Sequence, residues 1–255
     1  MTEVKKRFGI DYENSIEANR ELWAIHDWHA DGDEWDGQAR VLGVPYAEWK
    51  KALVDEFIVP YVTADMTVLE IAAGRGRWSE LLLPRCRKLI LVDLSPECVE
   101  YCRKKFQSWP NIDYIVTDGQ SLPGARDNNV NFVWSFDSFV HMEPEHIASY
   151  MREMARVLVP GGRACIHHAG RANAWLWLGG VRSHAKWLRR LYALLSMGVI
   201  KDDDGWRSNM SGELFRRLAE DAGLKVVAQQ RFWGPDNRYG VPRYRDLVTT
   251  LIKPS

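Results

Sequence analysis

The stretch VLEIAAGRGRWSE, residues 68–80, constrains the fold of this chain more than any other part of it. It opens with the apolar residues of a short buried strand, continues into a small, flexible loop, and ends in a segment of helical character. Glycines let a backbone approach a ligand closely, and the free amides at the start of the next helix favour a polar or negative group. The stretch therefore predicts a strand–loop–helix unit that holds a nucleotide-like ligand.

The same loop excludes two common nucleotide sites. The dinucleotide fingerprint requires G-x-G-x-x-G, but Ser79 stands where the third glycine should follow Gly74 and Gly76. A P-loop requires a Lys-Ser or Lys-Thr pair, and none follows the loop. The remaining signal is a set of acidic residues that each accompany the end of an apolar run: Glu70, Asp93 and Asp118.

With these motifs, the chain resembles class I S-adenosylmethionine-dependent methyltransferases over about residues 65–170. S-adenosylmethionine carries no pyrophosphate, so a third glycine is not needed. The resemblance implies that Glu70 lies near the amino-acid and ribose end of this cofactor, that Asp93 accepts both ribose hydroxyls, and that Asp118 accepts from the adenine amine. The implied cofactor contacts are Glu70, Ala72, Gly74, Gly76, Trp78, Asp93, Leu94, Asp118, Gly119, Gln120 and Phe136.

One feature departs from the family pattern. Many members have glycine where this chain has Ala72 and Ala73. Alanine is small enough for the loop, but its Cβ disfavours a positive φ. The departure concerns the geometry of the loop and not the class of cofactor.

Composition excludes several other functions. Lys+Arg and Asp+Glu both number 34, so no net charge attracts nucleic acid, and no nucleic-acid partner is expected. The N-terminus has no apolar signal region, and no window approaches the ~20 apolar residues of a membrane span. The cysteines lack the paired spacing of a zinc site. We expect a cytoplasmic protein without stable membrane insertion, and a homo-oligomer is left open.

Alternating strand and helix patterns predict an α/β fold: a doubly wound, seven-stranded, mostly parallel Rossmann-like sheet. Strands are expected near 67–71, 88–93, 113–117, 130–135, 162–168, 225–232 and 246–252, and helices near 77–84, 96–106, 143–157 and 211–223. Residues 1–62 are expected to form an N-terminal helical cap, and residues 63–255 the cofactor-binding domain. A Trp- and Arg-rich segment at about 172–200 predicts a helical lid inserted after the fifth strand.

Three histidines are placed by this pattern at the carboxyl ends of strands, where ligands bind in such folds. His141 follows the fourth strand, and His167 and His168 end the fifth. A sugar or aliphatic hydroxyl is a very weak acid, so its methylation requires a base, for which histidine is the usual candidate near neutral pH. His141 is the first candidate, with packing on the sheet edge as the alternative. Side chains alternate across a strand, so at most one of His167 and His168 is expected to face the pocket.

Aromatic and acidic residues outside the motifs are candidates for acceptor binding. They are Trp28, His29 and Trp35 in the cap, Asp137 after the fourth strand, and Tyr244 before the last strand. The acidic stretch 31–37 does not fit a calcium loop, because Trp35 and Leu42 occupy ligand positions. No metal is expected, although Asp31, Asp33 and Asp36 leave a divalent ion open as a weak alternative.

The segments 132–143 and 150–170 resemble bacterial methyltransferases of glycan and natural-product O-methylation. This resemblance implies a small-molecule or glycan acceptor and a hydroxyl as the methylated group. An N- or C-methyltransferase of a natural product is the second interpretation, and a non-catalytic S-adenosylmethionine-binding module is the third. The Asn/Asp-Pro-Pro-aromatic motif of adenine N-methyltransferases does not follow the fourth strand, which argues against DNA base methylation.

Overall fold

The computed structural model describes residues 5–7, 10–12, 15–25, 36–170, 208–242 and 244–255. Its centre is a seven-stranded sheet with the order β5-β4-β3-β6-β7-β11-β8. The strands are β3 (Thr67–Ile71), β4 (Lys88–Asp93), β5 (Ile112–Val116), β6 (Val130–Ser135), β7 (Leu158–His168), β8 (Lys225–Gln230) and β11 (Leu247–Ile252). β11 runs antiparallel to both β7 and β8, and the other strands run parallel to one another. The predicted fold class is confirmed.

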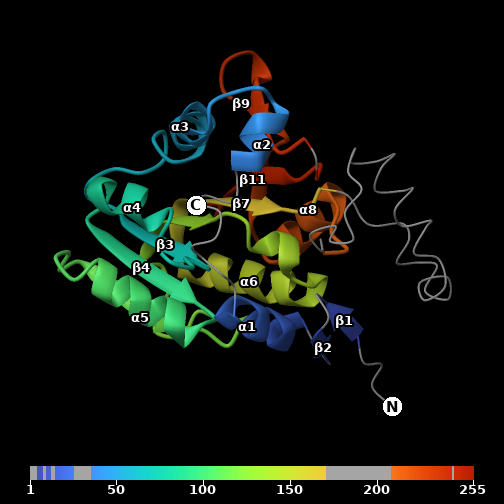
Figure 1. Ribbon diagram of the computed structural model, residues 1–255. Helices are drawn as coiled ribbons and strands as arrows, with labels where there is room; N and C mark the ends of the chain where they lie inside the picture. Colours follow the sequence, from blue (N-terminus) through green and yellow to red (C-terminus); the bar gives the residue numbers. More distant parts are fainter. Residues whose placement is uncertain (1–4, 8–9, 13–14, 26–35, 171–207, 243) are drawn as a thin grey trace.

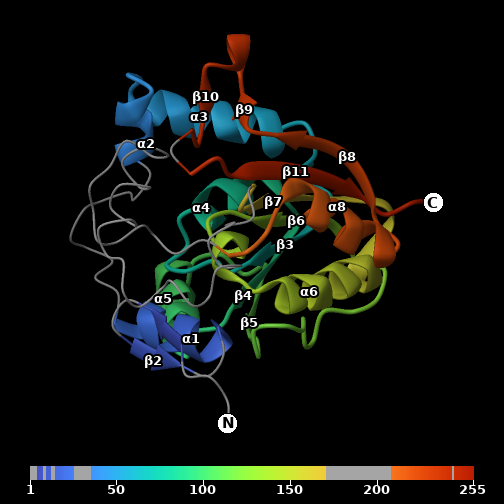
Figure 2. The same ribbon diagram turned by 90° about the vertical axis from the view of Figure 1, so that its right-hand side faces the viewer.

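Helices cover both faces of this sheet (Figures 1 and 2). One face packs against α3 (Tyr46–Phe57), α4 (Ser79–Leu82) and α5 (Pro96–Lys105), and the other against α6 (Pro144–Val157) and α8 (Gly212–Asp221). Each face has its own apolar core, because successive strand residues point to opposite sides. Two helices begin at serine caps: Ser95 Oγ accepts from the Cys98 N–H, and Ser211 Oγ accepts from the Leu214 N–H.

The strand order fixes where a ligand can bind. From β3 the chain moves outward to β4 and β5, and then returns to place β6 on the other side of β3. In parallel α/β sheets, ligands bind outside the carboxyl ends of the strands where the order reverses. The site should therefore be built from the segments that follow β3, β4, β5 and β6.

The described parts of residues 1–62, the region expected to act as one helical cap, lie on two sides of the domain. The hairpin of β1 (Lys5–Arg7) and β2 (Ile10–Tyr12) lies with α1 (Ser15–Ile25) near α5 (Figure 2). By contrast, α2 (Asp36–Val41) and α3 lie beside the hairpin of β9 (Phe232–Trp233) and β10 (Tyr239–Gly240), where the Trp49 indole donates to the Gly240 carbonyl at 2.9 Å. The sequence patterns did not predict α2 or either hairpin.

Two further expectations concern the rest of the chain. The predicted lid at 172–200 lies outside the described residues. Within the described part, no helix combines the length and the apolar character that crossing a bilayer would require.

Candidate functional site

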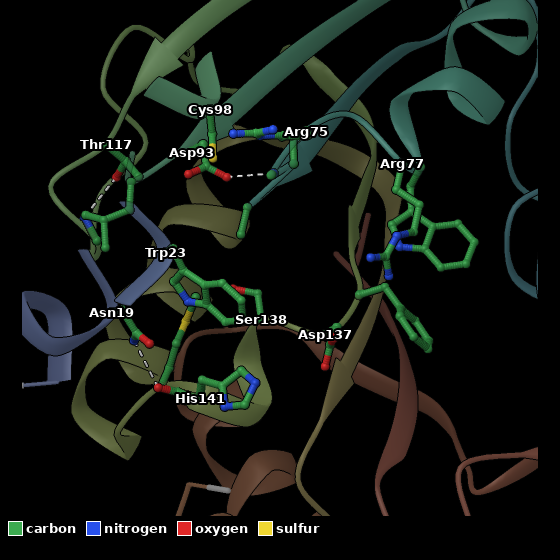
Figure 3. Close-up of a pocket in the computed structure, with 18 of the residues that line it drawn as sticks. Asn19, Trp23, Arg75, Arg77, Asp93, Cys98, Thr117, Asp137, Ser138 and His141 are labelled. Carbon is green, nitrogen blue, oxygen red and sulfur yellow. Dashed lines mark hydrogen bonds between the residues drawn. The ribbon is translucent and has the colours of Figure 1, made fainter. Parts of the chain in front are cut away.

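A cavity of about 410 Å³ lies at the expected place, the carboxyl ends of β3 to β6 (Figure 3). Nine of the predicted contacts line it: Ala72, Gly74, Trp78, Asp93, Leu94, Gly119, Phe136, Asp137 and His141. Figure 3 shows Asp93, Cys98 and Thr117 on one side of the cavity, and Arg77 and Asp137 on the other. The site therefore has two ends, one at the β4 and β5 loops and one at the β6 loop.

The loop after β3 is held by backbone hydrogen bonds in an unusual conformation. The Ala72 N–H donates to the Val92 carbonyl at 2.8 Å, and Ala72 adopts a φ of +60° in spite of its Cβ. Gly74, at φ +56°, donates its N–H to Asp93 Oδ2 at 2.7 Å. Gly76 does not line the cavity; a Cβ there would lie 2.5 Å from the Phe106 ring, so glycine is required for packing.

Asp93 ends β4 with its carboxylate at the cavity wall and is 7% exposed. Its Oδ1 accepts from the Ser95 N–H at 2.8 Å, and its Oδ2 accepts from the Gly74 N–H. Burial raises the pKa of Asp93, while these backbone hydrogen bonds lower it in part. A carboxylate fixed in this way has lone pairs left for hydroxyls of a ligand, which is the role expected for Asp93 toward a ribose.

Glu70 lies beneath the loop and does not line the cavity. It is 1% exposed, and its Oε2 accepts from the Ser79 hydroxyl at 2.5 Å. Its Oε1 has no hydrogen-bond partner among the described residues. Burial raises the pKa of Glu70 to about 8, so this carboxyl is mostly protonated at neutral pH. In this position Glu70 supports the first turn of α4.

The wall after β5 keeps only one of the three predicted contacts. Thr117 and Gly119 line the cavity, whereas Asp118 and Gln120 do not. Asp118 is exposed, and its Oδ1 accepts the N–H groups of Gln120 and Ser121 at 3.0 and 2.8 Å. Partial burial acts to raise the pKa of Asp118, but these hydrogen bonds outweigh it and hold the pKa below its usual value.

Helix α1 closes this side of the cavity. Gly119 has a φ of +90°, and a Cβ there would lie 2.9 Å from Cγ2 of Ile16. Asn19 and Trp23, further along α1, also line the cavity. Asn19 Nδ2 donates to the His141 carbonyl at 3.1 Å, so α1 connects the two ends of the site.

Titratable side chains gather at the end formed by the β6 loop. His141, at the close of a short 3-10 turn (Phe139–His141), lines the cavity and is 8% exposed. Its ring lies 5.8 Å from that of Trp23. Asp137, Ser138 and His146 line the same region. This end can orient a polar acceptor and take up its proton.

Neither His167 nor His168 lines the cavity. His168 lies on the opposite face of β7, stacked on Phe215 with the ring centres 3.6 Å apart. Its Nε2 lies 2.7 Å from the Thr249 hydroxyl, and burial lowers the pKa of His168 to about 3. His167 lies behind the cavity wall, stacked on Phe136 at 4.2 Å.

Several lining residues are not among the site residues expected from the sequence: Ile16, Asn19, Trp23, Lys50, Ala73, Arg75, Arg77, Glu80, Cys98, Tyr101, Lys105, Thr117, Ser138, Met142, His146 and Tyr150. His146 and Tyr150 lie four residues apart on α6, which is the spacing of one helix face. The sequence could therefore have predicted that both side chains lie on the same side of this helix. Lys50 is different, because nothing in its sequence context separates it from its neighbours on α3. Its Nζ lies 5.3 Å from the centre of the Trp78 ring.

The remaining candidates fall elsewhere. Trp28, His29, Trp35, Asp31 and Asp33 lie outside the described residues, as does the side chain of Asp36. Tyr244 is half-buried and packs on the apolar core without lining the cavity. Among the described residues, no group of His, Cys, Asp and Glu side chains could hold a metal ion.

Comparisons with known proteins agree with this geometry. Residues 68–162 match the family described as a methyltransferase domain. Nodulation protein S of Rhizobium tropici is 26% identical over 168 residues, which are 62% of this chain and 61% of that protein. Malonyl-(acyl-carrier protein) O-methyltransferase 1 of Ilyobacter polytropus is 30% identical over 101 residues, 36% of this chain and 38% of that protein. The chain thus spans less than two thirds of both relatives.

A solved structure extends the likeness over nearly the whole chain. The N-methyltransferase NodS from Bradyrhizobium japonicum, in complex with S-adenosyl-L-homocysteine, superposes with a TM-score of 0.58 and covers 95% of this chain and 100% of that one. The identity is 15%, so this likeness is one of fold.

Proposed function

We propose that this chain, whose residues 68–162 match the methyltransferase domain family, is a class I S-adenosylmethionine-dependent methyltransferase that methylates a hydroxyl of a sugar, an oligosaccharide or another small molecule. His141 is proposed as the general base. The observation that carries the proposal is the set of titratable groups at the β6 end of the cavity, with His141 and Asp137 both in the wall. This end lies across the cavity from Asp93 (Figure 3).

The residues at the β4 end fit the cofactor. Asp93 presents a buried carboxylate for the ribose hydroxyls, and Gly74 and Ala73 bring the main chain to the cavity wall without large side chains. Thr117 and Gly119 form the wall beyond Asp93, where a flat adenine would lie. S-adenosylmethionine supplies a methyl group already activated by its positively charged sulfur.

At the β6 end, this chain's residues align the acceptor and remove its proton. As the acceptor oxygen bonds to the methyl carbon and the carbon–sulfur bond breaks, the hydroxyl proton would pass to a ring nitrogen of His141. Trp78 and Phe136 line the same cavity, with ring centres 5.2 Å apart. Both rings are nearly buried, 4% and 5% exposed, and give the cavity an apolar wall between its two ends.

The test separates cofactor binding from chemistry. His141→Ala should leave the affinity for S-adenosylhomocysteine nearly unchanged and lower kcat by ~10²–10⁴-fold, the usual effect of a positioned base. His141→Gln should not restore activity, because an amide can orient a hydroxyl but cannot take its proton. The wild-type kcat should fall on the acid side, where histidine takes up a proton, and that limb should disappear in the variants. Near-full activity of His141→Gln would contradict the role as base.

N-methylation is the second candidate, and the likeness to NodS favours it. In that case His141 and Asp137 would orient an amine that is already a good nucleophile. Incubation with methyl-labelled cofactor and matched sugar, phenol and amine acceptors distinguishes the two. Labelled methyl groups on hydroxyl oxygens would support the proposal. Labelled methyl groups on nitrogen would instead support N-methylation. Tight cofactor binding without any transfer would point to a non-catalytic binding module.

A further inference from the structure

A buried histidine–aspartate pair lies directly behind the β6 end of the cavity. His167 on β7 is 0% exposed, and Asp246, the residue before β11, is 1% exposed. His167 Nε2 lies 3.4 Å from Asp246 Oδ2. A buried pair of this kind contributes little net stability, because both groups must be removed from water. Its place beside the cavity therefore calls for another explanation.

The other ring nitrogen of His167 holds the cavity wall. The backbone N–H of Asp137 donates to His167 Nδ1 at 3.1 Å. A nitrogen that accepts a hydrogen bond carries no proton, so the single proton of the neutral ring is assigned to Nε2, facing Asp246. His167 Nε2 and Asp246 Oδ2, 3.4 Å apart, do not meet hydrogen-bond geometry, so Asp246 favours this tautomer through the closeness of an acceptor-only group to the Nε2 proton.

The segment held in this way has a left-handed backbone. Asp137 has a φ of +68°, a conformation that costs most residues other than glycine ~1–2 kcal/mol and aspartate less. The neighbouring Phe136 ring stacks on the His167 ring at 4.2 Å, with 13° between the ring planes. His167 thus contacts two consecutive wall residues, one through its edge and one through its face. Strain of this kind persists only where the surroundings enforce it.

The same turn carries His141. The His141 N–H donates to the Ser138 carbonyl at 2.8 Å, so the position of the 3-10 turn depends on the residues just before it. We propose that Asp246 and His167 are a positioning pair, which fixes the tautomer of His167 and through it the Phe136–Asp137 turn that presents His141 to the acceptor. His167 itself touches no acceptor. The expected effect on rate rests on the proposed site of methyl transfer. The contacts of His167 with Asp137, Phe136 and Asp246 do not depend on that proposal.

The tautomer gives a test that needs no acceptor. A ¹H–¹⁵N correlation spectrum of histidine-labelled protein should show His167 with a proton on Nε2 and none on Nδ1, assigned by comparison with a His167 variant. A proton on Nδ1 would overturn the inference, whatever reaction the protein catalyses. Conversely, the expected tautomer together with no transfer to any hydroxyl would count against the proposed function alone.

Two matched substitutions test the effect on rate. Asn at position 167 can place its amide oxygen near the position of Nδ1 and accept from Asp137, whereas Gln reaches toward Asp246 and leaves the Asp137 N–H without its acceptor. Both lose the ring that stacks on Phe136. His167→Gln should lower kcat by about 10- to 100-fold, the range that a misplacement near 1 Å produces. Its affinity for S-adenosylhomocysteine should change less than kcat, because Asp93 is not affected and only Phe136 among the expected cofactor contacts touches His167.

His167→Asn should keep kcat within about 3-fold of the wild type, less than 0.7 kcal/mol in the barrier. Equal kcat values for the two variants, or a lower value for His167→Asn, would overturn the positioning role. A merely structural role of the buried pair would lower stability more in His167→Asn, which no longer reaches Asp246, and would not leave His167→Asn the more active of the two variants.

Discussion

Glu70 gives a prediction that can be worked through quantitatively. Its carboxyl titrates with a pKa of about 8 in the folded chain because of burial, against an ordinary value of 4.5. Below pH 4.5 the group is protonated in both the folded and the unfolded chain and costs nothing. As the pH rises from 4.5 to about 8, only the unfolded chain releases this proton, so the folded state loses about 1.4 kcal/mol per pH unit. Relative to its value below pH 4.5, the free energy of unfolding thus falls as the pH rises, and the loss is complete once the pH passes the folded pKa of Glu70.

Glu70→Gln removes this titration while keeping an acceptor for the Ser79 hydroxyl. The free energy of unfolding of the variant, minus that of the wild type, should rise by about 3 kcal/mol between pH 5 and pH 8. Urea unfolding of the ligand-free proteins at the two pH values measures this difference, and the other titrating groups largely cancel. A difference that stays within about 1 kcal/mol would refute the reasoning that burial keeps this acid protonated.

Two further variants serve as controls for Glu70. The Ser79 hydrogen bond lowers the pKa of Glu70, so Ser79→Ala should raise this pKa further and extend the loss of stability to higher pH instead of removing it. Glu145→Gln replaces an exposed glutamate at the start of α6, whose side chain stays in water in both states. Its effect on the free energy of unfolding should be the same at both pH values.

Three other predictions follow from the cavity. Asp93→Ala should weaken binding of S-adenosylmethionine by ~1.5–3 kcal/mol through the loss of charge-assisted hydrogen bonds; calorimetry with an unchanged affinity in a folded variant would contradict the ribose contact. Ala72→Gly should raise the free energy of unfolding by ~0.5–1 kcal/mol, because it relieves the φ of +60° at a smaller entropic cost, as urea unfolding would measure. Amide hydrogen exchange in α1, residues 15–25, should slow when S-adenosylhomocysteine is added, because this helix lines the cavity; identical exchange with and without the ligand would show a merely packed appendage.

The sheet could be predicted from the sequence because each strand is marked by a local run of apolar residues. The mostly apolar runs at 67–71, 88–93 and 130–135 begin and end as expected, since strands buried on both faces are read as nearly continuous apolar segments even where Glu70 or Asn131 interrupts them. The division of the N-terminal residues could not be predicted in the same way. Its cause is a contact between Trp49 and the β9–β10 hairpin, which joins residues far apart in the sequence.

The histidines show a similar limit. The alternation along β7 correctly separates His167 from His168 onto opposite faces. Nothing local reveals that the ring of Phe136 lies between His167 and the cavity. Nor does the local sequence show that Asp246 lies near Nε2, just before β11, which pairs antiparallel with β7. Long-range pairing therefore decides which titratable group reaches an acceptor and which one holds the wall.

Glu70 shows what strand geometry adds to a motif. An acid near the end of a strand suggests a ligand contact. Side chains alternate along a strand, however, so Glu70 shares a face with Val68 and points under α4. The backbone after Ile71, in contrast, turns into the cavity. The residues that reach the cavity are those beyond the last strand residue, Ala72 to Gly74, and the acid that reaches it is Asp93, which ends its own strand. A single position along the strand thus decides whether a carboxyl meets a ligand or is buried as a neutral acid, and the pH dependence of Glu70→Gln measures that difference directly.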